Sequence, residues 1–310
     1  MNSQPQIIGF GLATLDVLIR LPEMPTWAHS GSAASFRFDG GGMVGTAMVA
    51  AAKLGARVGF VGTAGSDDAA EFKLKSFREC GVDLSHLVRR DGPEDQVVIV
   101  YVHSETGERT FSLVGGGQYQ PMSPDKLDRA YFTGADYLHI DGFLHHEAML
   151  CAAKWMKAAG KTVTMDGSKT DGVVSEQHRE LIRYVDVLIT GEGYGRGLTG
   201  LDDVWAAGEK ALELGPRVFI ETRGERGCFG VTQAGERFHI PAFEVDVVDT
   251  TGAGDVFHGA YIVGMMRGWP PQQCARFATA VSAIKCTKLG GRAGIPTWEQ
   301  TMAFLGNSRK

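Results

Sequence analysis

The sequence has no run of the roughly 18 consecutive apolar residues that a membrane-spanning helix requires. Its first twenty residues carry no basic segment ahead of their short apolar run, so we expect no signal peptide. The five cysteines are odd in number and include no C-x-x-C pair, which favours reduced thiols over disulfides or a zinc site. We therefore expect a soluble, cytoplasmic protein that does not associate with membranes.

Positive charge and repetition are also scarce. The 36 acidic residues outnumber the 31 lysines and arginines and give a formal net charge of −5, whereas nucleic-acid binders commonly show a basic face. No internal repeat, low-complexity tract or long linker interrupts the 310 residues. At 44% hydrophobic residues, a chain of this length can bury a substantial core. These features predict one domain, 1–310, that does not bind nucleic acid.

Short apolar runs alternate with helical stretches along most of the chain. The strand-like runs are "QIIGFGL", "RVGFVGT", "DYLHID", "TVTMDG", "DVLITG" and "RVFIET". Helical spacing of apolar residues occurs at 43–56, 146–159, 175–182, 203–214, 254–288 and 298–305. Continuous apolar strands separated by helices predict βαβ units around a mainly parallel sheet, and therefore an α/β fold.

Two segments break this alternation. Residues 27–38, "WAHSGSAASFRF", and 96–113, "QVVIVYVHSETGERTFSL", look like strands with no helix between them. In the second segment the glycine-containing turn "SETGE" separates two apolar runs, as in a β-hairpin. We interpret these segments as a small β-sheet that forms a lid from residues 12–38 and 96–114.

The stretch "VDVVDTTGAGDVFHGAYIVGMM", 245–266, places Gly252-Ala253-Gly254 ahead of Asp255 and an apolar helix. It overlaps the strand-like "FEVDVV", and ligands of open α/β sheets bind beyond the carboxyl ends of strands. Small residues let backbone N–H groups approach an anion at a helix N-terminus. An ionised aspartate can accept a proton from a hydroxyl. The pattern suits phosphoryl transfer, although an isolated G-x-G-D is more often an ordinary helix start with an acidic residue.

Two long segments resemble the signatures of the PfkB (ribokinase-like) carbohydrate kinases. "VDTTGAGDVFHGA" is similar to the C-terminal signature, and residues 39–83, which begin "DGGGMVGTAMVAAAKLGA", are similar to the N-terminal one. The resemblance covers nearly the whole chain. It implies a ribokinase-like three-layer α/β/α fold, ATP and Mg²⁺ as cofactors, and a homodimer formed through the lid.

The resemblance also implies roles for individual residues. Asp255 would be the catalytic base, and the backbone amides of the preceding residues would form an anion hole: Gly252, Ala253 and Gly254. Four residues would bind the sugar: Asp16, Gly41, Gly42 and Thr46. The turn in "ETRGERGCFG" would lie near the ATP phosphates, through Thr222, Gly224 and Gly227. "KCTKLGGRAGIP" would flank the adenine, and Asp249 would help to hold a monovalent cation such as K⁺.

Two positions depart from the family pattern. Many relatives carry asparagine where Thr46 stands, and threonine has less reach and fewer donors. The N-x-x-E motif that family members use for Mg²⁺ and phosphate aligns with "GEGY", so Gly191 and Tyr194 replace its defining residues. Glu192 is the one carboxylate left there as a candidate Mg²⁺ ligand.

Other polar residues have two interpretations. His145 and His146 follow a strand end that carries Asp141 and could face the pocket, but partly exposed residues at a helix start are the more common case. Asp166 fits a pocket wall and a turn equally well. Loop cations more often remain solvated than bind phosphate, and the candidates are Lys169 and Arg223. Cys228 and Cys286 are expected to be inert thiols near the core.

The leading hypothesis is an ATP-dependent kinase for a hydroxyl group of a small sugar, with a lid that excludes water. The chain looks like the sulfofructose kinase branch, and more loosely like ketohexose kinases. An anionic substrate would need cations in the lid, yet the first lid segment has none before Arg37, and Arg109 lies by the hairpin turn. This favours a neutral ketose or related monosaccharide.

Three further hypotheses belong to other substrates or classes. An anionic sugar or a nucleoside remains an alternative substrate. A non-catalytic sugar- or nucleotide-binding relative is a further alternative, although Asp255 and the glycine loop are both intact. A dinucleotide-dependent dehydrogenase is rejected because "GFGLATLD" lacks the third glycine of its motif.

Overall fold

The computed structural model describes residues 4–117, 119–168 and 172–307. Its main sheet has eight strands in the spatial order β14-β13-β12-β11-β10-β9-β1-β4. These are β1 (Ile7–Phe10), β4 (Val58–Val61), β9 (Tyr137–Ile140), β10 (Thr162–Asp166), β11 (Val187–Gly191), β12 (Val218–Thr222), β13 (Cys228–Thr232) and β14 (Arg237–Ile240). The pairs β12–β13 and β13–β14 are antiparallel and all the others are parallel.

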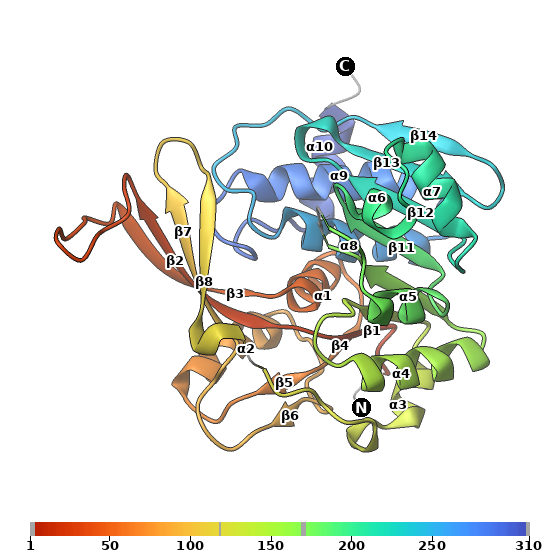
Figure 1. Ribbon diagram of the computed structural model, residues 1–310, viewed down its shortest axis with the longest axis horizontal. Coiled ribbons are helices and arrows are strands. Elements are labelled where there is room, and N and C mark those ends of the chain that lie inside the picture. Colours follow the sequence, from red (N-terminus) through yellow and green to blue (C-terminus); the bar gives the residue numbers. More distant parts are fainter. Residues whose placement is uncertain (1–3, 118, 169–171, 308–310) are drawn as a thin grey trace.

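Helices cover both faces of this sheet, which gives the three-layer α/β/α architecture that was predicted (Figure 1). One layer contains α1 (Met43–Lys53), α2 (Asp68–Glu79), α8 (Ala253–Met266), α9 (Pro271–Cys286) and α10 (Trp298–Asn307). The other contains α3 (Arg129–Gly134), α4 (His146–Ala158), α5 (Glu176–Ile182), α6 (Tyr194–Thr199) and α7 (Val204–Leu212). Three short 3₁₀ turns are η1 (Val114–Gly117), η2 (Pro124–Lys126) and η3 (Gly224–Arg226).

The two cores follow from the pleat of the strands. Side chains alternate between faces, so Ile7 packs under the α1–α8 layer while Ile8 packs under the α4 layer. Ile189 and Leu188 of β11 divide in the same way. Strands buried on both faces carry apolar residues at successive positions. This is why the six apolar runs identify the strands of the parallel part of the sheet.

A second sheet of four strands stands apart from the main layers, at the left of Figure 1. Its order is β3-β2-β7-β8, from β2 (Thr14–Leu21), β3 (Ser35–Gly41), β7 (Val97–His103) and β8 (Arg109–Leu113). Strand β2 is antiparallel to β3 and parallel to β7, while β7 and β8 form the predicted hairpin. A third sheet pairs β5 (Thr63–Ala64) with β6 (Val88–Arg89) in parallel.

Two strand predictions are wrong. Residues 27–34 are irregular, and strand β3 begins only at Ser35, opposite Arg20 of β2. The segment 243–248, "FEVDVV", is also irregular. The chain leaves the sheet edge at Pro241, which has no amide hydrogen to donate to a ladder. The amide of Val248 then donates to the carbonyl of Cys286 at the end of α9, at 2.8 Å, so a helix end and not a strand holds this segment.

None of the helices in the described part of the chain combines the length and the apolar character of a membrane span. The most apolar one, α8, instead packs inside the protein against α1 and α9.

A glycine permits the close approach of α8 to α1. A Cβ on Gly259 would overlap the carbonyl oxygen of Ala47 and come within 3.1 Å of Ala50. We expect Gly259→Ala to lower the free energy of unfolding by about 2–4 kcal/mol, because neither helix can move without disturbing a packed core. Chemical denaturation would measure this. Gly306→Ala is the matched control, because a Cβ there meets open space on α10, and an equal loss in both variants would contradict the packing argument.

Candidate active site

The N-terminus of α8 offers backbone amides to an anion. Gly252 precedes the helix with a φ of 75°, a left-handed conformation that favours glycine, and a Cβ there would also press on Gly291. The amide of Ala253 donates to the carbonyl of Thr250 at 3.2 Å. Among the described residues, the amides of Gly252 and Gly254 have no acceptor. These two N–H groups are therefore available at the positive end of the helix dipole.

Asp255 lies half-buried in the first turn of α8. No residue in the described ranges donates a hydrogen bond to its carboxylate. Burial and the nearby Asp166 raise the pKa of Asp255 to about 7, against the opposing effects of His258 and Lys285. A carboxylate that titrates near neutral pH is well matched to accept a proton from a hydroxyl group under those conditions.

A buried histidine–aspartate pair lies near Asp255. His258, three residues further along the same helix face, places Nε2 3.4 Å from Oδ2 of Asp166. Burial alone would raise the pKa of Asp166, but His258 and the amide of Ser168 lower it below its ordinary value. The ring of His139 lies 5.1 Å from that of His258. Asp166 therefore holds a turn, as one of its two interpretations proposed, and also sets the charge around Asp255.

Asp16, the predicted sugar ligand, lies on β2 against Gly41. Its carboxylate accepts a hydrogen bond of 2.6 Å from the Thr14 hydroxyl, and a Cβ on Gly41 would overlap it. Burial raises the pKa of Asp16 to about 6, although Thr14 and Arg292 act in the opposite direction. Gly42 begins α1 with a φ of 83° and leaves no room for a side chain. Gly41 therefore lets the Asp16 carboxylate lie directly against its backbone, and Gly42 lets the start of α1 lie against Leu12 and Ala13.

Arg292 is a component of this site that the sequence did not reveal. Its side chain is fully buried, and it donates hydrogen bonds to the hydroxyls of Thr46 at 3.4 Å and Ser76 at 2.8 Å, and to the carbonyl of Gly41. The guanidinium also stacks 4.5 Å from the centre of the Phe77 ring. The helix α2, the glycine segment and the C-terminal loop thus meet at one cation.

The glycines of "DGGGMVG" make room for this arginine. A Cβ on Gly40 or Gly45 would overlap the guanidinium of Arg292. Thr46 is fully buried beside it and also lies next to Gly252. The structure therefore places Thr46 between the two halves of the site, in contact with Arg292 and next to Gly252.

The predicted nucleotide turn ends β12. The hydroxyl of Thr222 donates to the carbonyl of Thr190 at 3.0 Å. Gly227 has a φ of 77°, and a Cβ there would overlap the carbonyl oxygen of Ile240, so it is required for the turn into β13. Gly224, with a φ of 55°, borders open space. Of the three predicted residues, Gly224 is the one that leaves the backbone accessible.

Helix α9 connects this turn to the anion site, by which we mean the N-terminus of α8 with the amides of Gly252 and Gly254. Its Thr279 hydroxyl lies 3.8 Å from the Cys228 sulfur, and one helical turn later the Ser282 hydroxyl donates to the carbonyl of Ala253 at 2.8 Å. Residues three apart on a helix are separated by about 4.5 Å along its axis. The turn after β12 and the start of α8 are therefore neighbours on one face of the protein.

Glu192, the candidate Mg²⁺ ligand, is partly exposed after β11 and pairs with Arg226 of the nucleotide turn. Tyr194 is buried in the core, with its hydroxyl 3.1 Å from Nδ1 of His178. Within the described residues, no group of three or more histidine, cysteine or acidic side chains could hold a metal ion. A single carboxylate suits Mg²⁺, which commonly binds one or two carboxylates together with phosphates and waters.

Several remaining predictions are settled by burial. His145 is fully buried and accepts a hydrogen bond of 2.8 Å from the Met122 amide, so its expected partial exposure is wrong. Asp141 is also buried and accepts a hydrogen bond from the amide of Leu12 at 2.8 Å.

The loop cation Arg223 pairs with Glu221 and is not simply solvated. The buried thiols Cys228 and Cys286 have raised pKa values, as expected of inert core cysteines, while Lys169 lies outside the described residues.

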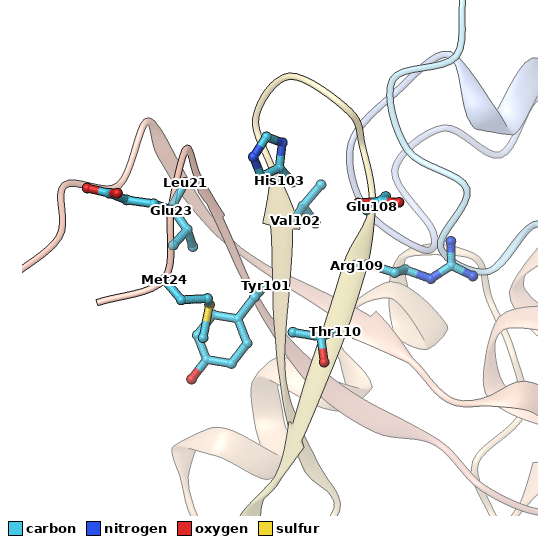
Figure 2. A pocket seen from close by; sticks show the side chains of 9 residues that line it. All are labelled: Leu21, Glu23, Met24, Tyr101, Val102, His103, Glu108, Arg109 and Thr110. Carbon is cyan, nitrogen blue, oxygen red and sulfur yellow. The ribbon is translucent and has the colours of Figure 1, made fainter. Parts of the chain in front are cut away.

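One cation of the small sheet reaches the site. Figure 2 shows Arg109 extending from β8 away from its neighbours on the sheet. Its guanidinium donates a hydrogen bond to the hydroxyl of Thr250, two residues before Gly252. In the sequence Arg109 lies by the hairpin turn, whereas in the structure it lies beside the loop that leads to Gly252.

A family model described as pfkB family carbohydrate kinase matches residues 7–298. The ATP-dependent ribose-1-phosphate kinase of Halopiger xanaduensis is 26% identical over 97% of this chain and 98% of its own. The aminoimidazole riboside kinase of Salmonella typhimurium is 31% identical over 86% of this chain and 88% of its own. The structure of Arabidopsis thaliana ribokinase complexed with ribose and ATP is 25% identical, with a TM-score of 0.84 over 98% of this chain and 99% of that one.

The chain belongs to the pfkB family of carbohydrate kinases, and its fold is that of ribokinase. It is a sugar or nucleoside kinase of this type. The resemblance read from the two signatures is confirmed at the level of family, fold and enzyme class.

The raised pKa of Asp255 makes a prediction about stability. Between pH 3.8 and about 7 the folded protein holds a proton that the unfolded chain has released, so Asp255 destabilises the fold increasingly as pH rises through this window. Asp255→Asn removes the buried charge. We expect its melting temperature to exceed that of the wild type by about 2–6 °C at pH 8 and to match it near pH 4.

Thermal unfolding followed by circular dichroism at both pH values measures this difference. Asp246→Asn, on the exposed loop before α8, is the control and should change nothing. Equal melting temperatures of the Asp255→Asn variant and the wild type at pH 8 would show that the folded state tolerates the Asp255 charge without cost.

Proposed function

We propose that the protein transfers the γ-phosphoryl group of ATP to a hydroxyl group of a small neutral sugar, a ketose or related monosaccharide. The observation that carries this proposal is the placement of Asp255, a half-buried carboxylate without a hydrogen-bond donor among the described residues, beside the unengaged amides of Gly252 and Gly254. A proton acceptor next to donors for developing negative charge is what phosphoryl transfer requires.

In this mechanism Asp16 and the Gly41–Gly42 backbone hold the sugar hydroxyls. Asp255 takes the proton of the attacking sugar hydroxyl. At the same time the oxygen of that hydroxyl forms a bond to the γ-phosphorus, and the bond from the γ-phosphorus to ADP breaks. The amides of Gly252 and Gly254 donate to the phosphoryl oxygens. These roles are supported by adjacency, because Thr46 and Arg292 join the Gly41 backbone to the start of α8.

The cofactor assignments follow the open part of the site. The backbone at Gly224, after Thr222 and before the turn at Gly227, would accommodate the ATP phosphates. Mg²⁺ would neutralise part of the phosphate charge, and Glu192 would hold it through its carboxylate. The relative from Arabidopsis thaliana was solved with ribose and ATP, which supports a sugar and ATP as the ligand pair here.

The small sheet would act as a lid over this site. Arg109, Phe111 and Leu113 share one face of β8, and Arg109 on that face already touches Thr250. A cover excludes water, which would otherwise accept the phosphoryl group. Arg109 also gives an anionic sugar a partner, and the phosphorylated sugar named for the Halopiger xanaduensis relative makes this the second candidate. A nucleoside is the third, from the Salmonella typhimurium relative.

A coupled assay of ADP release with Mg-ATP and a substrate panel tests the proposal. The panel contains neutral ketoses and aldoses, their phosphates, a sulfonated ketose and nucleosides. We expect turnover with a neutral sugar and a loss of kcat of about 10²-fold or more in Asp255→Asn, with Asp246→Asn as the control. Turnover that survives Asp255→Asn would contradict the base assignment. A preference for phosphorylated or sulfonated sugars, lost in Arg109→Gln, would replace the neutral substrate by an anionic one.

A homodimer is also part of the proposal. The face of the small sheet opposite Arg109 carries apolar side chains that are exposed or half-buried: Val17, Ile19, Phe36, Phe38, Ile99 and Tyr101. A patch of this kind on a soluble protein commonly marks an interface, and a second copy would cover it. A cytoplasmic location is proposed as well, and the five free cysteines suit it.

Light scattering across micromolar concentrations would measure the oligomeric state. We expect twice the mass of the chain for the wild type and one chain mass for Phe36→Asp, because an aspartate at a buried interface is costly. Met302→Asp, the same change at a partly exposed methionine of α10, should leave the dimer intact. A monomeric wild type would exclude the dimer.

A further inference from the structure

Lys285 carries a fully buried ammonium group in the last turn of α9. Its Nζ donates a hydrogen bond of 2.9 Å to the backbone carbonyl of Asp249. The C-terminal end of a helix attracts a cation, because its unpaired carbonyls give it partial negative charge. Burial lowers the pKa of Lys285, and Asp249 acts against that shift. The ammonium is therefore set between a helix end and the loop that leads to the anion site.

All the oxygen atoms of Asp249 are already engaged. One carboxylate oxygen accepts from the amide of Thr251 at 2.8 Å and the other from the amide of Gly290 at 2.8 Å, while the carbonyl accepts from Lys285. The amide of Asp249 donates to the carbonyl of Cys286 at 3.1 Å. These contacts fix the segment that runs directly into Thr250 and Gly252. The direction of the anion-site amides depends on them.

This arrangement does not fit the monovalent cation that the family resemblance implies at Asp249. Such an ion would have to share the carbonyl or carboxylate oxygens of Asp249 with the donors from which each already accepts a hydrogen bond. It would also lie within a few ångströms of the Lys285 ammonium, where like charges repel strongly in a buried setting. The site can hold one cation, and the side chain of Lys285 supplies it.

We propose that Lys285 is a built-in replacement for a monovalent cation, and that this enzyme requires no K⁺ or Na⁺ for activity or stability. Lys285 is a positioning residue, which holds the carbonyl of Asp249 and through it the loop before Gly252. The proposal rests on the proposed kinase function for its kinetic readout and is independent of that function for its stability readout.

The wild-type protein provides the first test. Initial rates and melting temperatures are measured in KCl, NaCl and tetramethylammonium chloride at equal ionic strength, because the tetramethylammonium ion is too large for a carbonyl-lined site. We expect rates within about twofold of one another and equal melting temperatures in the three salts. A rate or a melting temperature that rises substantially with KCl over tetramethylammonium chloride would overturn the proposal, and this arm needs no variant.

Lys285→Met provides the second test, because it removes the charge and keeps most of the length of the side chain. We expect kcat in tetramethylammonium chloride to fall at least about tenfold, and KCl to restore much of it and to raise the melting temperature of the variant. Lys53→Met is the matched control, since Lys53 also ends a helix and donates to a backbone carbonyl, that of Ile295, at 3.2 Å. It should show no response specific to KCl.

The outcomes separate this proposal from the kinase assignment. If no panel substrate is turned over, the assignment fails while the melting temperatures still report on Lys285. If Lys285→Met folds and keeps its full rate in every salt, Lys285 does not position the loop and the proposal is wrong. If Lys285→Met does not fold, the wild-type salt series remains decisive.

Discussion

The charge of the candidate site depends on which of its buried carboxylates are stabilised by hydrogen bonds. Asp16, Asp141, Asp166 and Asp249 are all buried, and Asp255 is half-buried among them. Each of the first four accepts at least one hydrogen bond: from Thr14, from Leu12, from Ser168 and from Thr251, respectively. Asp255 alone accepts none from the described residues. A buried carboxylate without donors is the one most easily protonated, and this is the one that lies beside the free amides of α8.

The pKa values follow this order. Asp166 and Asp249 have partners of opposite charge or several amides, and their pKa values lie below the ordinary range. Asp16 and Asp141 accept hydrogen bonds, and Arg292 acts on Asp16 as well, but burial outweighs these effects and raises both pKa values to about 6. Asp255 has no hydrogen-bond donor among the described residues, and burial together with Asp166 raises its pKa to about 7 against the effects of His258 and Lys285. Asp255, the proposed base, therefore differs from its neighbours in the absence of hydrogen-bond donors among the described residues, while the neighbouring carboxylates are held in their ionised state at neutral pH.

The layers and most of the strands could be predicted from the sequence, because a strand buried on both faces must be apolar at successive positions. Asp255 and the glycines before it could be singled out because they lie in a long signature, and Asp16 because its segment resembles that of the family. The contacts of Arg292, Lys285 and His258 could not be predicted, because their partners lie far away in the chain: Arg292 meets Gly41 across 251 residues. The strand prediction for "FEVDVV" was wrong for a related reason. Its alternating apolar and acidic residues resemble a strand, but its backbone forms a hydrogen bond with the end of α9 and not with another strand.

Lys285 links the geometry of the site to its titration. Its ammonium fixes the carbonyl of Asp249, and the same charge lowers the pKa of Asp255 against the effect of Asp166. A diffusible cation could serve both purposes only while bound, and the protonation of Asp255 would then vary with the salt around the protein. A covalently attached cation keeps both constant. Its cost is the burial of an ammonium group, which the carbonyl of Asp249 and the C-terminal end of α9 offset.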